Sequence, residues 1–359
     1  MDNLKQTPRI KFIAYLQVIG IILVVFGHSL HESPTPYTEL LVYEMLYSFH
    51  MPLFIFVSGF LMYMTSFACG REAPAIRNFF LKKVKRLLLP FFILSTITFI
   101  PRSLLSGFAD DSISLTFTSY IRSFINTNEM VIPFFWFIET SFTLLIFTFV
   151  IIVICRKINL SDNVPMLMLL ICFILFPFFQ ISSPSIFSLD NTVRLCPYFI
   201  LGCLYCKYES VIDKYIPWTN PLFFVVVCSL WAILYFTFKG TSLMVLCSTA
   251  GIMMCVSVAQ IFVKYGINCL EHLVGTNYII FLLSWYFNVA SQQMLHSFTD
   301  FHWFIYTVIS LITGIYVPWL IYRYLESSAD KKWVKITALL LGQNLRKQSN
   351  FQHRRFAII

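Results

Sequence analysis

Ten long apolar runs divide this chain of 359 residues. A helix that crosses the hydrocarbon core of a bilayer needs about 20 mostly apolar residues, and most of the runs reach that length. Only 12% of the residues are charged, against about 25% in soluble domains. The sequence therefore predicts an all-α polytopic membrane protein, a bundle of about ten transmembrane helices. The predicted spans are 12–30, 44–66, 87–105, 132–154, 164–181, 193–206, 219–238, 242–263, 273–295 and 302–324.

The Lys and Arg residues predict the orientation of this bundle. With the N-terminus in the cytoplasm, all but four of the 26 Lys and Arg residues fall in segments on the cytoplasmic side, where such residues are enriched. The four exceptions are Arg102, Arg122, Arg194 and Lys239. We therefore expect a cytoplasmic segment over 1–11, a transmembrane domain over 12–325 and a basic cytoplasmic tail over 326–359. This distribution also explains the net charge of +9 without nucleic acid as a partner.

The cysteines and histidines do not form a metal or disulfide pattern. Most of the ten cysteines lie in apolar runs, where a free Cys behaves as a small hydrophobic residue. Cys203 and Cys206 form a CxxC motif without a second pair, so no zinc or redox site is predicted. The pairs His28–Glu32 and His28–His31 come closest to ligand spacing, and neither supplies a full ligand set. We expect no metal and no permanently bound cofactor.

Two of the apolar runs each hold one histidine. His28 lies near the end of the first run and His50 near the start of the second. An ionisable side chain in a membrane helix is costly and marks a functional site by default. Gln17 lies eleven positions before His28, about three turns, so both lie on one helix face. His28 is either an interfacial histidine bonded to a backbone carbonyl or a general base that takes a proton from a hydroxyl.

Several motifs occur in the order known from one family. They are Gly20-x6-Gly27-His28, Phe49-His50-Met51-Pro52-Leu53-Phe54-x-Phe56-x-Ser58-Gly59-Phe60, Lys82-Lys83-x2-Arg86-Leu87-Leu88-x-Pro90, Phe135-Trp136-Phe137-Ile138, Tyr198-Phe199-x2-Gly202 and Gly275-Thr276-Asn277-x-Ile279-x-Phe281-Leu282-Leu283-Ser284. Together they cover nearly the whole chain and resemble acyltransferase family 3. Within it, the chain is most similar to the sugar O-acetylases of the fucose 4-O-acetylase kind.

This resemblance implies a membrane-bound O-acyltransferase. Members of the family take an acyl group, usually acetyl from cytoplasmic acetyl-CoA, and place it on a hydroxyl of a surface or exported glycan or a lipid-linked sugar. The resemblance implies that His28 is the family's essential first-span histidine. The short loops and the lack of a glycosylation context favour a place among the lipids of a bacterial plasma (inner) membrane. The chain departs from the family at Gln17, where a basic residue is usual, and at Ala14, near which an Asp is common.

The remaining candidates have two interpretations each. Lys82, Lys85 and Arg86 either set the topology and contact anionic lipid or bind the phosphates of CoA, for which Arg offers a planar fork. Glu139 either pairs with a structural partner such as Arg194 or a Tyr, or it has a catalytic role, orienting His28 or binding the hydroxyls of the acceptor.

Four further residues are candidates for binding. Trp136 either packs in the core or stacks on a sugar or adenine ring. Arg194 is a candidate for contact with a glycan, and His50 for contact with the acceptor. Asn277 either caps its helix or, with Gln17, holds the donor and stabilises an oxyanion.

Two other functions compete with acyl transfer. Intramembrane His, Glu and Arg also suit a transporter or flippase that moves a glycan precursor by a proton relay. Transporters often carry inverted repeats, and the sequence shows none. A family member without catalysis, acting as a scaffold, is the second alternative, and the missing charge at Gln17 is the observation that supports it.

Overall fold

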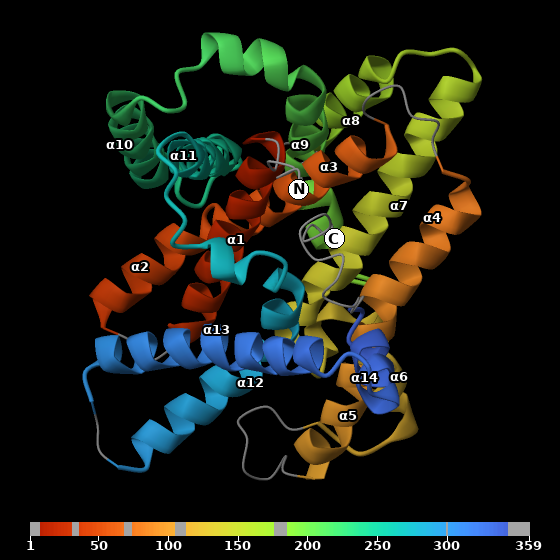
Figure 1. Cartoon of the computed structure of the whole chain (residues 1–359), viewed down its shortest axis with the longest axis vertical. Coiled ribbons are helices and arrows are strands. Elements are labelled where there is room, and N and C mark those ends of the chain that lie inside the picture. The colour runs from red at the N-terminus through yellow and green to blue at the C-terminus, as the bar shows by residue number, and fades with distance from the viewer. Residues whose placement is uncertain are drawn as a thin grey trace. The chain divides into compact units, whose positions relative to one another are not determined.

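The computed structural model describes residues 8–30, 36–67, 74–104, 113–175, 185–298 and 301–343 (Figure 1). These residues are mostly helical, and within these ranges no strand occurs, only a single β-bridge between Asn126 and Ile186. The prediction of an all-α chain is confirmed.

Fourteen α-helices follow one another along the described ranges. They are α1 (Pro8–Ser29), α2 (Tyr37–Tyr47), α3 (His50–Ser66), α4 (Ile76–Lys83), α5 (Leu89–Leu104), α6 (Phe117–Ile125), α7 (Trp136–Lys157), α8 (Asn163–Leu175), α9 (Leu189–Tyr215), α10 (Pro221–Phe238), α11 (Met244–Lys264), α12 (Asn277–His296), α13 (Trp303–Ser327) and α14 (Lys332–Leu340). Short 3-10 turns cover Thr127–Glu129 (η4), Pro133–Phe135 (η5) and Glu271–Leu273 (η7), and a π-helical turn covers Val84–Leu88 (η2).

Seven helical stretches in the described part of the chain are long and apolar enough to cross a membrane, with α2–α3 and α4–α5 each counted as one. They are Arg9–Ser29, Tyr37–Ser66, Ile76–Leu104, Pro133–Lys157, Pro221–Phe238, Met244–Lys264 and Trp303–Ser327. This supports an integral membrane protein, while the exact number of ten spans and the orientation of the termini stay predictions.

Three of the predicted spans are absent from that set of seven. The span over 164–181 corresponds to the shorter helix α8, and its residues 176–181 lie outside the described residues. The span over 193–206 lies inside α9, which also carries charged residues near both of its ends. The span over 273–295 corresponds to α12, whose sequence includes Asn, Ser, Gln and His. Polarity, rather than length, separates α9 and α12 from the other long helices.

Helices also occur where the sequence suggested connecting segments. Helix α2 begins at Tyr37, ahead of the predicted span over 44–66, and α6 lies in the polar segment that precedes the fourth predicted span. Thr116 caps α6, because its side chain accepts a hydrogen bond from the backbone N–H of Ser119. In the predicted tail α14 is helical, whereas residues 1–7 and 344–359 of the predicted terminal segments lie outside the described residues.

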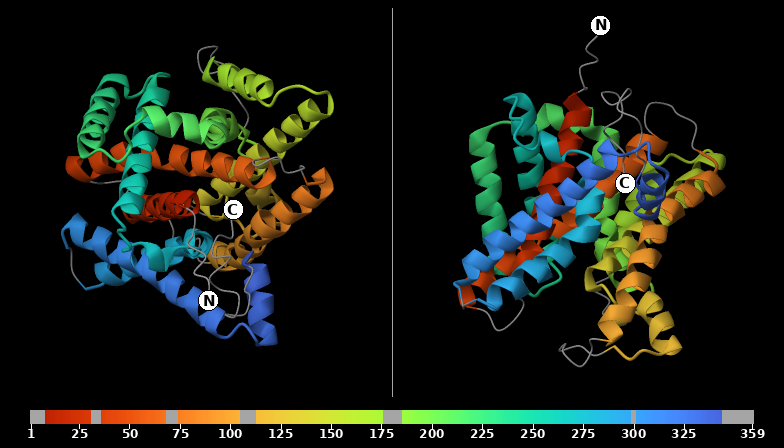
Figure 2. Two further views of the ribbon diagram at one scale, coloured as in Figure 1. Left: turned by 45° about the horizontal axis from the view of Figure 1, so that its top comes forward. Right: turned by 60° about the horizontal axis from the view of Figure 1, so that its bottom comes forward.

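The chain divides into two compact units. Unit 1 comprises Met1–Val57, Tyr208–Lys335 and Asn344–Ile359, and unit 2 comprises Ser58–Lys207 and Ile336–Gln343. Within unit 1, α1 packs against α11, α12 and α13, and α10 packs against α11. Helices α12 and α13 lie side by side along most of their length (Figures 1 and 2).

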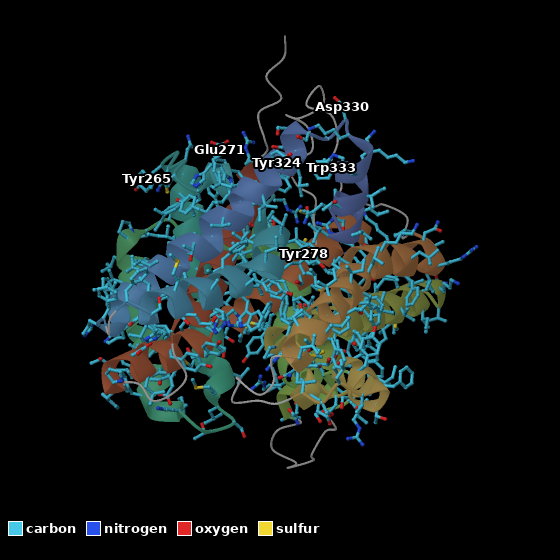
Figure 3. The ribbon with its side chains drawn as sticks, turned by 90° about the horizontal axis from the view of Figure 1, so that it is seen from below. Tyr265, Glu271, Tyr278, Tyr324, Asp330 and Trp333 are labelled. Carbon is cyan, nitrogen blue, oxygen red and sulfur yellow. The ribbon has the colours of Figure 1, made fainter. Side chains whose placement is uncertain are left out.

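In unit 1, α1 and α12 run in the same direction. Near the start of α1, Lys11 Nζ donates a hydrogen bond of 2.8 Å to Asn268 Oδ1, in the segment that leads into α12. Near the end of α1, Ser29 lies beside Asn288 of α12. The loop and helix ends at one end of unit 1 are marked in Figure 3 by Tyr265, Glu271 and Tyr324. The positions of the candidate residues on α1 and α12 can therefore be compared along one common axis.

Unit 2 is held by a polar cluster at the end of α7. Arg156 donates two hydrogen bonds to Asp162, from Nε at 2.8 Å and from a terminal nitrogen at 2.6 Å. Tyr63 of α3 donates a third, at 2.9 Å, to the same carboxylate. Burial by itself raises the pKa of Asp162, but the hydrogen bonds from Arg156 and Tyr63 outweigh it and bring the pKa below its ordinary value.

A close backbone contact joins α3 to α9 in the same unit. A Cβ placed on Gly59 would lie 2.0 Å from the carbonyl oxygen of Phe199, so only glycine fits there. Cys203 also belongs to this contact, because its Sγ donates to the carbonyl oxygen of Gly59 at 3.3 Å. Small residues at such positions let membrane helices approach closely.

Candidate active site

Two histidines come together in unit 1. His28 is the penultimate residue of α1, and His50 is the first residue of α3. His50 is completely buried, His28 is half-buried, and the two imidazoles are near enough to interact electrostatically. The sequence placed one histidine in each of the first two apolar runs, and the fold of unit 1 brings them to one place.

The ring of His50 has a fixed orientation. Its Nδ1 lies 2.9 Å from the carbonyl oxygen of Leu46, and because a carbonyl oxygen only accepts, Nδ1 carries the proton. Nε2 is buried and has no hydrogen-bond partner within the part of the chain that the structure describes. With its proton on Nδ1, the ring presents Nε2 as an acceptor, and no donor among the described residues reaches it.

Gly27 of α1 packs tightly against the residues around His50. A Cβ placed on Gly27 of α1 would lie 3.8 Å from Nε2 of His50, 3.1 Å from Tyr47 and 3.4 Å from Leu46. The ring of Tyr47 also packs edge-on against that of His50, with 4.4 Å between centroids. Gly27, Tyr47 and Leu46 are thus closely packed next to the ring of His50.

A polar cluster follows His28 at the same end of α1. Gln292 Nε2 donates to the carbonyl oxygen of Ser29 at 3.0 Å, and the amide of Asn288 lies 3.3 Å from Ser29 Oγ. With the orientation that satisfies both ends of its amide, Asn288 donates to the carbonyl oxygen of Ser310 at 2.8 Å. Sequence reasoning missed Asn288 and Gln292, although the spacing of four residues places both on one face of a helix.

Gln17 and Asn277 lie at a different level of unit 1 from the histidines. Both are buried. Gln17 precedes His28 on α1 by eleven positions, and Asn277 precedes Asn288 on α12 by eleven positions. On parallel helices this corresponds to about 16 Å along the axis. The structure thus brings Gln17 and Asn277 to similar depths but not beside His28.

Asn277 occupies the first turn of α12. Its Oδ1 is buried without a hydrogen-bond partner among the described residues. The residue before it, Thr276, uses its hydroxyl to donate to the carbonyl oxygen of Leu273 and does not cap the helix with its side chain. Asn277 is therefore a buried amide at the start of a helix, where backbone N–H groups also point outward.

In unit 2, Glu139 lies in a group of buried oxygens on α7. Its Oε2, Thr140 Oγ1 and Ser141 Oγ are buried and have no partner in the described ranges. Thr148 Oγ1, two turns further along the helix, is also buried without a hydrogen-bond partner in these ranges. The interpretation that Arg194 pairs with Glu139 is wrong, because the exposed Arg194 donates to Asn191 at 2.8 Å and forms no pair with Glu139. The sequence drew attention to the charge and missed the hydroxyls.

Trp136 starts α7, half-buried, with its ring edge-on to that of Phe137 at 6.2 Å between centroids. It lies one turn before Glu139 on the same helix, so the two side chains share a face.

The basic motif of unit 2 surrounds the π-helical turn Val84–Leu88. Pro90 has no N–H and its ring clashes with the carbonyl of residue 86 in a regular helix. The wider turn relieves this clash, and the backbone N–H of Leu89 bonds to the carbonyl oxygen of Val84. Lys82 and Lys85 are exposed and Arg86 is half-buried, so the three cations are presented by an irregular segment.

The candidate residues thus fall into two sets. His28, His50, Gln17 and Asn277 belong to unit 1. Those of unit 2 are Lys82, Lys85, Arg86, Trp136, Glu139 and Arg194. Among the described residues no group of three or more His, Cys, Asp or Glu side chains is arranged to hold a metal ion.

Comparison with known proteins assigns the chain to a family. A family model described as an acyltransferase domain matches residues 10–323, a range that includes every candidate residue above. No curated protein and no solved structure matches the chain.

Proposed function

The chain belongs to the family of this acyltransferase domain, and from that premise we propose that it is a membrane-bound O-acyltransferase. We propose that it moves an acetyl group from cytoplasmic acetyl-CoA to a hydroxyl of a surface or exported glycan or a lipid-linked sugar, as fucose 4-O-acetylases do. Its proposed place is the plasma (inner) membrane of a bacterium, among membrane lipids. The membrane helices and the family support the coarser statement that it is an integral membrane acyltransferase.

One observation carries the proposed chemistry: a half-buried histidine lies beside a second, fully buried one at the end of α1. In the proposed reaction, His28 removes the proton of the acceptor hydroxyl as the oxygen attacks the thioester carbonyl. The C–O bond forms, the C–S bond breaks, and the protonated His28 returns its proton to the departing thiolate of CoA. A covalent acyl-histidine, formed by attack of the ring nitrogen, is the alternative sequence of steps.

The level of Gln17 and Asn277 suggests a role in holding the donor. Acyl-CoA carries amide groups in its arm, each with one N–H donor and one carbonyl acceptor. The unpartnered Oδ1 of Asn277 fits the N–H of such an amide, and the uncharged Gln17 suits an amide better than a phosphate. We therefore propose that these residues contact the arm of the donor, about 16 Å along the helices from His28.

For unit 2 we propose two binding roles. Arg86, Lys85 and Lys82 bind phosphate groups of CoA, because Arg and Lys are the side chains that proteins use for phosphate. Glu139 binds a hydroxyl of the acceptor, because its buried Oε2 has no donor among the described residues and a hydroxyl supplies one. Trp136, on the same face of α7, would stack on a sugar ring, and the exposed Arg194 would contact a glycan.

The experiment that tests acyl transfer uses the purified full chain in lipid nanodiscs with radiolabelled acetyl-CoA. Glycan and lipid-linked sugars from the host membrane serve as acceptors. Label transfer and release of CoA thiol are expected from the wild type, and a loss of at least a hundredfold is expected for His28→Ala. His296→Ala, at the exposed end of α12, is the matched control. Activity of His28→Ala near the wild-type rate would reject the role of His28, and no label transfer with substrate movement alone would indicate a transporter.

A further inference from the structure

The end of α1 that carries His28 is held by a side chain from another helix. The last four carbonyl oxygens of an α-helix have no partner within the helix. Ser29, the last residue of α1, is completely buried, so water does not reach its carbonyl oxygen. Gln292 of α12 supplies the hydrogen bond instead, because its Nε2 donates to that oxygen at 3.0 Å. The carbonyl group of the residue that directly follows His28 is thus bound to α12.

The side chain of Ser29 fixes the same turn a second time. Its Oγ donates to the carbonyl oxygen of Val25 at 2.7 Å, one turn back along α1. The amide of Asn288 lies 3.3 Å from the same Oγ. Asn288 and Gln292 are four positions apart on α12 and therefore share a face. This face of α12 contacts both the backbone and the side chain of the residue next to His28.

Helix α13 fixes this part of α12. A Cβ placed on Gly314 of α13 would lie 2.0 Å from the amide of Asn288, so the two helices are in close contact there. Thr313 Oγ1 donates to Ser291 Oγ, the neighbour of Gln292, at 3.2 Å. Small residues and hydrogen bonds of this kind join neighbouring membrane helices. Gln292 therefore belongs to a part of α12 that is packed against both α1 and α13.

The hydrogen bond from Gln292 is made to the backbone beside His28, so it acts on the imidazole through the last turn of α1. The direction of a side chain at a helix end follows the backbone of that turn, and helix ends fray. A general base must lie within about 3 Å of the proton that it removes. A misplacement of about 1 Å in such a group costs about a hundredfold in rate. The hydrogen bond to Ser29 is therefore expected to affect the rate through His28.

Resting on the proposed acyl transfer, we propose that Gln292 is a positioning residue for His28. Its amide holds the end of α1 so that the imidazole keeps the orientation in which it takes the proton of the acceptor hydroxyl. Gln292 itself neither takes a proton nor binds a substrate. Loss of its amide therefore lowers kcat and leaves the KM for acetyl-CoA unchanged.

Gln292→Met tests this role in the full chain in lipid nanodiscs. Methionine is about as long as glutamine but has no N–H, so the carbonyl oxygen of Ser29 loses its donor. Radiolabelled acetyl-CoA is varied, and the glycan and lipid-linked sugar extract of the host membrane is the acceptor at one saturating concentration. We expect kcat to fall at least about tenfold and the KM for acetyl-CoA to stay within about twofold of the wild-type value. An unchanged kcat would overturn the proposal, and so would a raised KM at wild-type kcat, which would indicate a binding role.

Tyr15→Phe is the matched control for a loss of stability. Tyr15 also joins α1 to unit 1 by a hydrogen bond, from its hydroxyl to Asn268 Oδ1 at 3.1 Å, but near the other end of the helix. Both variants are expected to lower the melting temperature by similar amounts, whereas only Gln292→Met is expected to lower kcat. Equal losses of kcat in the two variants would show a general effect of stability and would overturn the proposal.

A second measurement separates positioning from a structural role. In the His28→Ala protein there is no imidazole to orient, so adding Gln292→Met is expected to change the residual rate by less than about twofold. If the losses of the two single variants multiply instead, Gln292 acts independently of His28 and the proposal is wrong. Gln292→Leu, which also lacks a donor, takes the place of Gln292→Met if that protein does not fold.

The wild type tests the premise separately. If it transfers no label, acyl transfer itself is rejected, and the role of His28 with it. If it transfers label and Gln292→Met has the wild-type kcat, only the positioning role is rejected.

Discussion

Tyr63 and Asp162 lie 99 positions apart in the sequence, and a hydrogen bond of 2.9 Å joins them in unit 2. Arg156 donates to the same carboxylate, so three helices or their ends meet at one buried anion. The carboxylate of Asp162 is 7% exposed and the guanidinium of Arg156 is 33% exposed, and the loss of either donor affects a group that water cannot solvate fully.

We expect Arg156→Met to destabilise the protein by about 3 kcal/mol, because it leaves a buried carboxylate without its counter-charge. Tyr63→Phe removes one neutral donor and is expected to cost about 1–2 kcal/mol. Thermal unfolding in detergent measures both changes. Lys157→Ala, at an exposed position beside Arg156, is the control. Equal melting temperatures for Arg156→Met and Lys157→Ala would contradict the structural role of this cluster.

The same carboxylate predicts a dependence of stability on pH. The pKa of Asp162 in the folded protein lies below its ordinary value of 3.8, so above pH 3.8 the ion pair contributes its full stabilisation. As the pH falls below that value, the unfolded chain takes up a proton first and stability declines. The difference in melting temperature between wild type and Asp162→Asn is therefore expected to be constant from about pH 7 to 5 and to shrink towards about pH 3. A constant difference at all these values would disprove the linkage.

Glu139 is expected to show opposite effects on stability and activity. Glu139→Leu removes a buried oxygen that has no partner among the described residues, so it is expected to stabilise the protein by about 1 kcal/mol. It is also expected to lower acceptor kcat/KM about tenfold, as the loss of one hydrogen bond to the acceptor would. Thr148→Val removes another unpartnered oxygen of α7 and serves as the control, with raised stability and wild-type kinetics. Wild-type activity in Glu139→Leu would leave the residue without a catalytic role.

Arg86→Gln is expected to raise the KM for acetyl-CoA about tenfold with little change in kcat, because a phosphate contact made equally in the ground state and the transition state affects binding alone. Acetyl-dephospho-CoA, which lacks one phosphate, identifies the contact. If Arg86 binds that phosphate, the variant no longer distinguishes the two donors. Arg77→Gln, on the exposed surface of α4, is the control. An unchanged KM in Arg86→Gln would show that Arg86 does not bind acetyl-CoA.

Gly59→Ala is expected to destabilise unit 2 by about 3 kcal/mol or prevent folding, because its Cβ would overlap a backbone oxygen that has no room to move. Gly240→Ala is the comparison: nothing lies within 4 Å of its Cβ, and only its positive φ of 79° is unfavourable, at about 1–2 kcal/mol. Melting temperatures of the two variants should differ accordingly. A milder effect at Gly59 would show that α3 and α9 separate readily.

The helical class of the fold was predictable because long apolar runs have few alternatives in a membrane. The count was harder, because α9 carries charged residues near both ends and α12 carries Asn, Ser, Gln and His along its length. Apolar length alone cannot identify such helices. The break between α2 and α3 at Ser48 and Phe49 was also not evident from hydropathy.

The candidate site was predictable only where a single residue type carried the signal. His28, His50 and Glu139 drew attention because charge and ionisable rings are rare in apolar runs. The close approach of Gly27 to Tyr47 and His50 depends on the packing of α1 against its neighbours, which no local pattern specifies. The hydroxyls beside Glu139 were missed because Ser and Thr are common in membrane helices and usually bond to the backbone.

The π-helical turn at Val84–Leu88 changes the phase of the helix that contains it. A regular helix advances 100° per residue, so one extra residue in a turn rotates every side chain before it by about that angle relative to those after it. Deleting Leu88 would restore the regular repeat, yet it would turn Lys82 and Phe79 towards a different quadrant of the helix. The chain without Leu88 would be about as hydrophobic and as helical as the wild type, yet the side chain of Lys82 would point in a different direction relative to the residues after the turn.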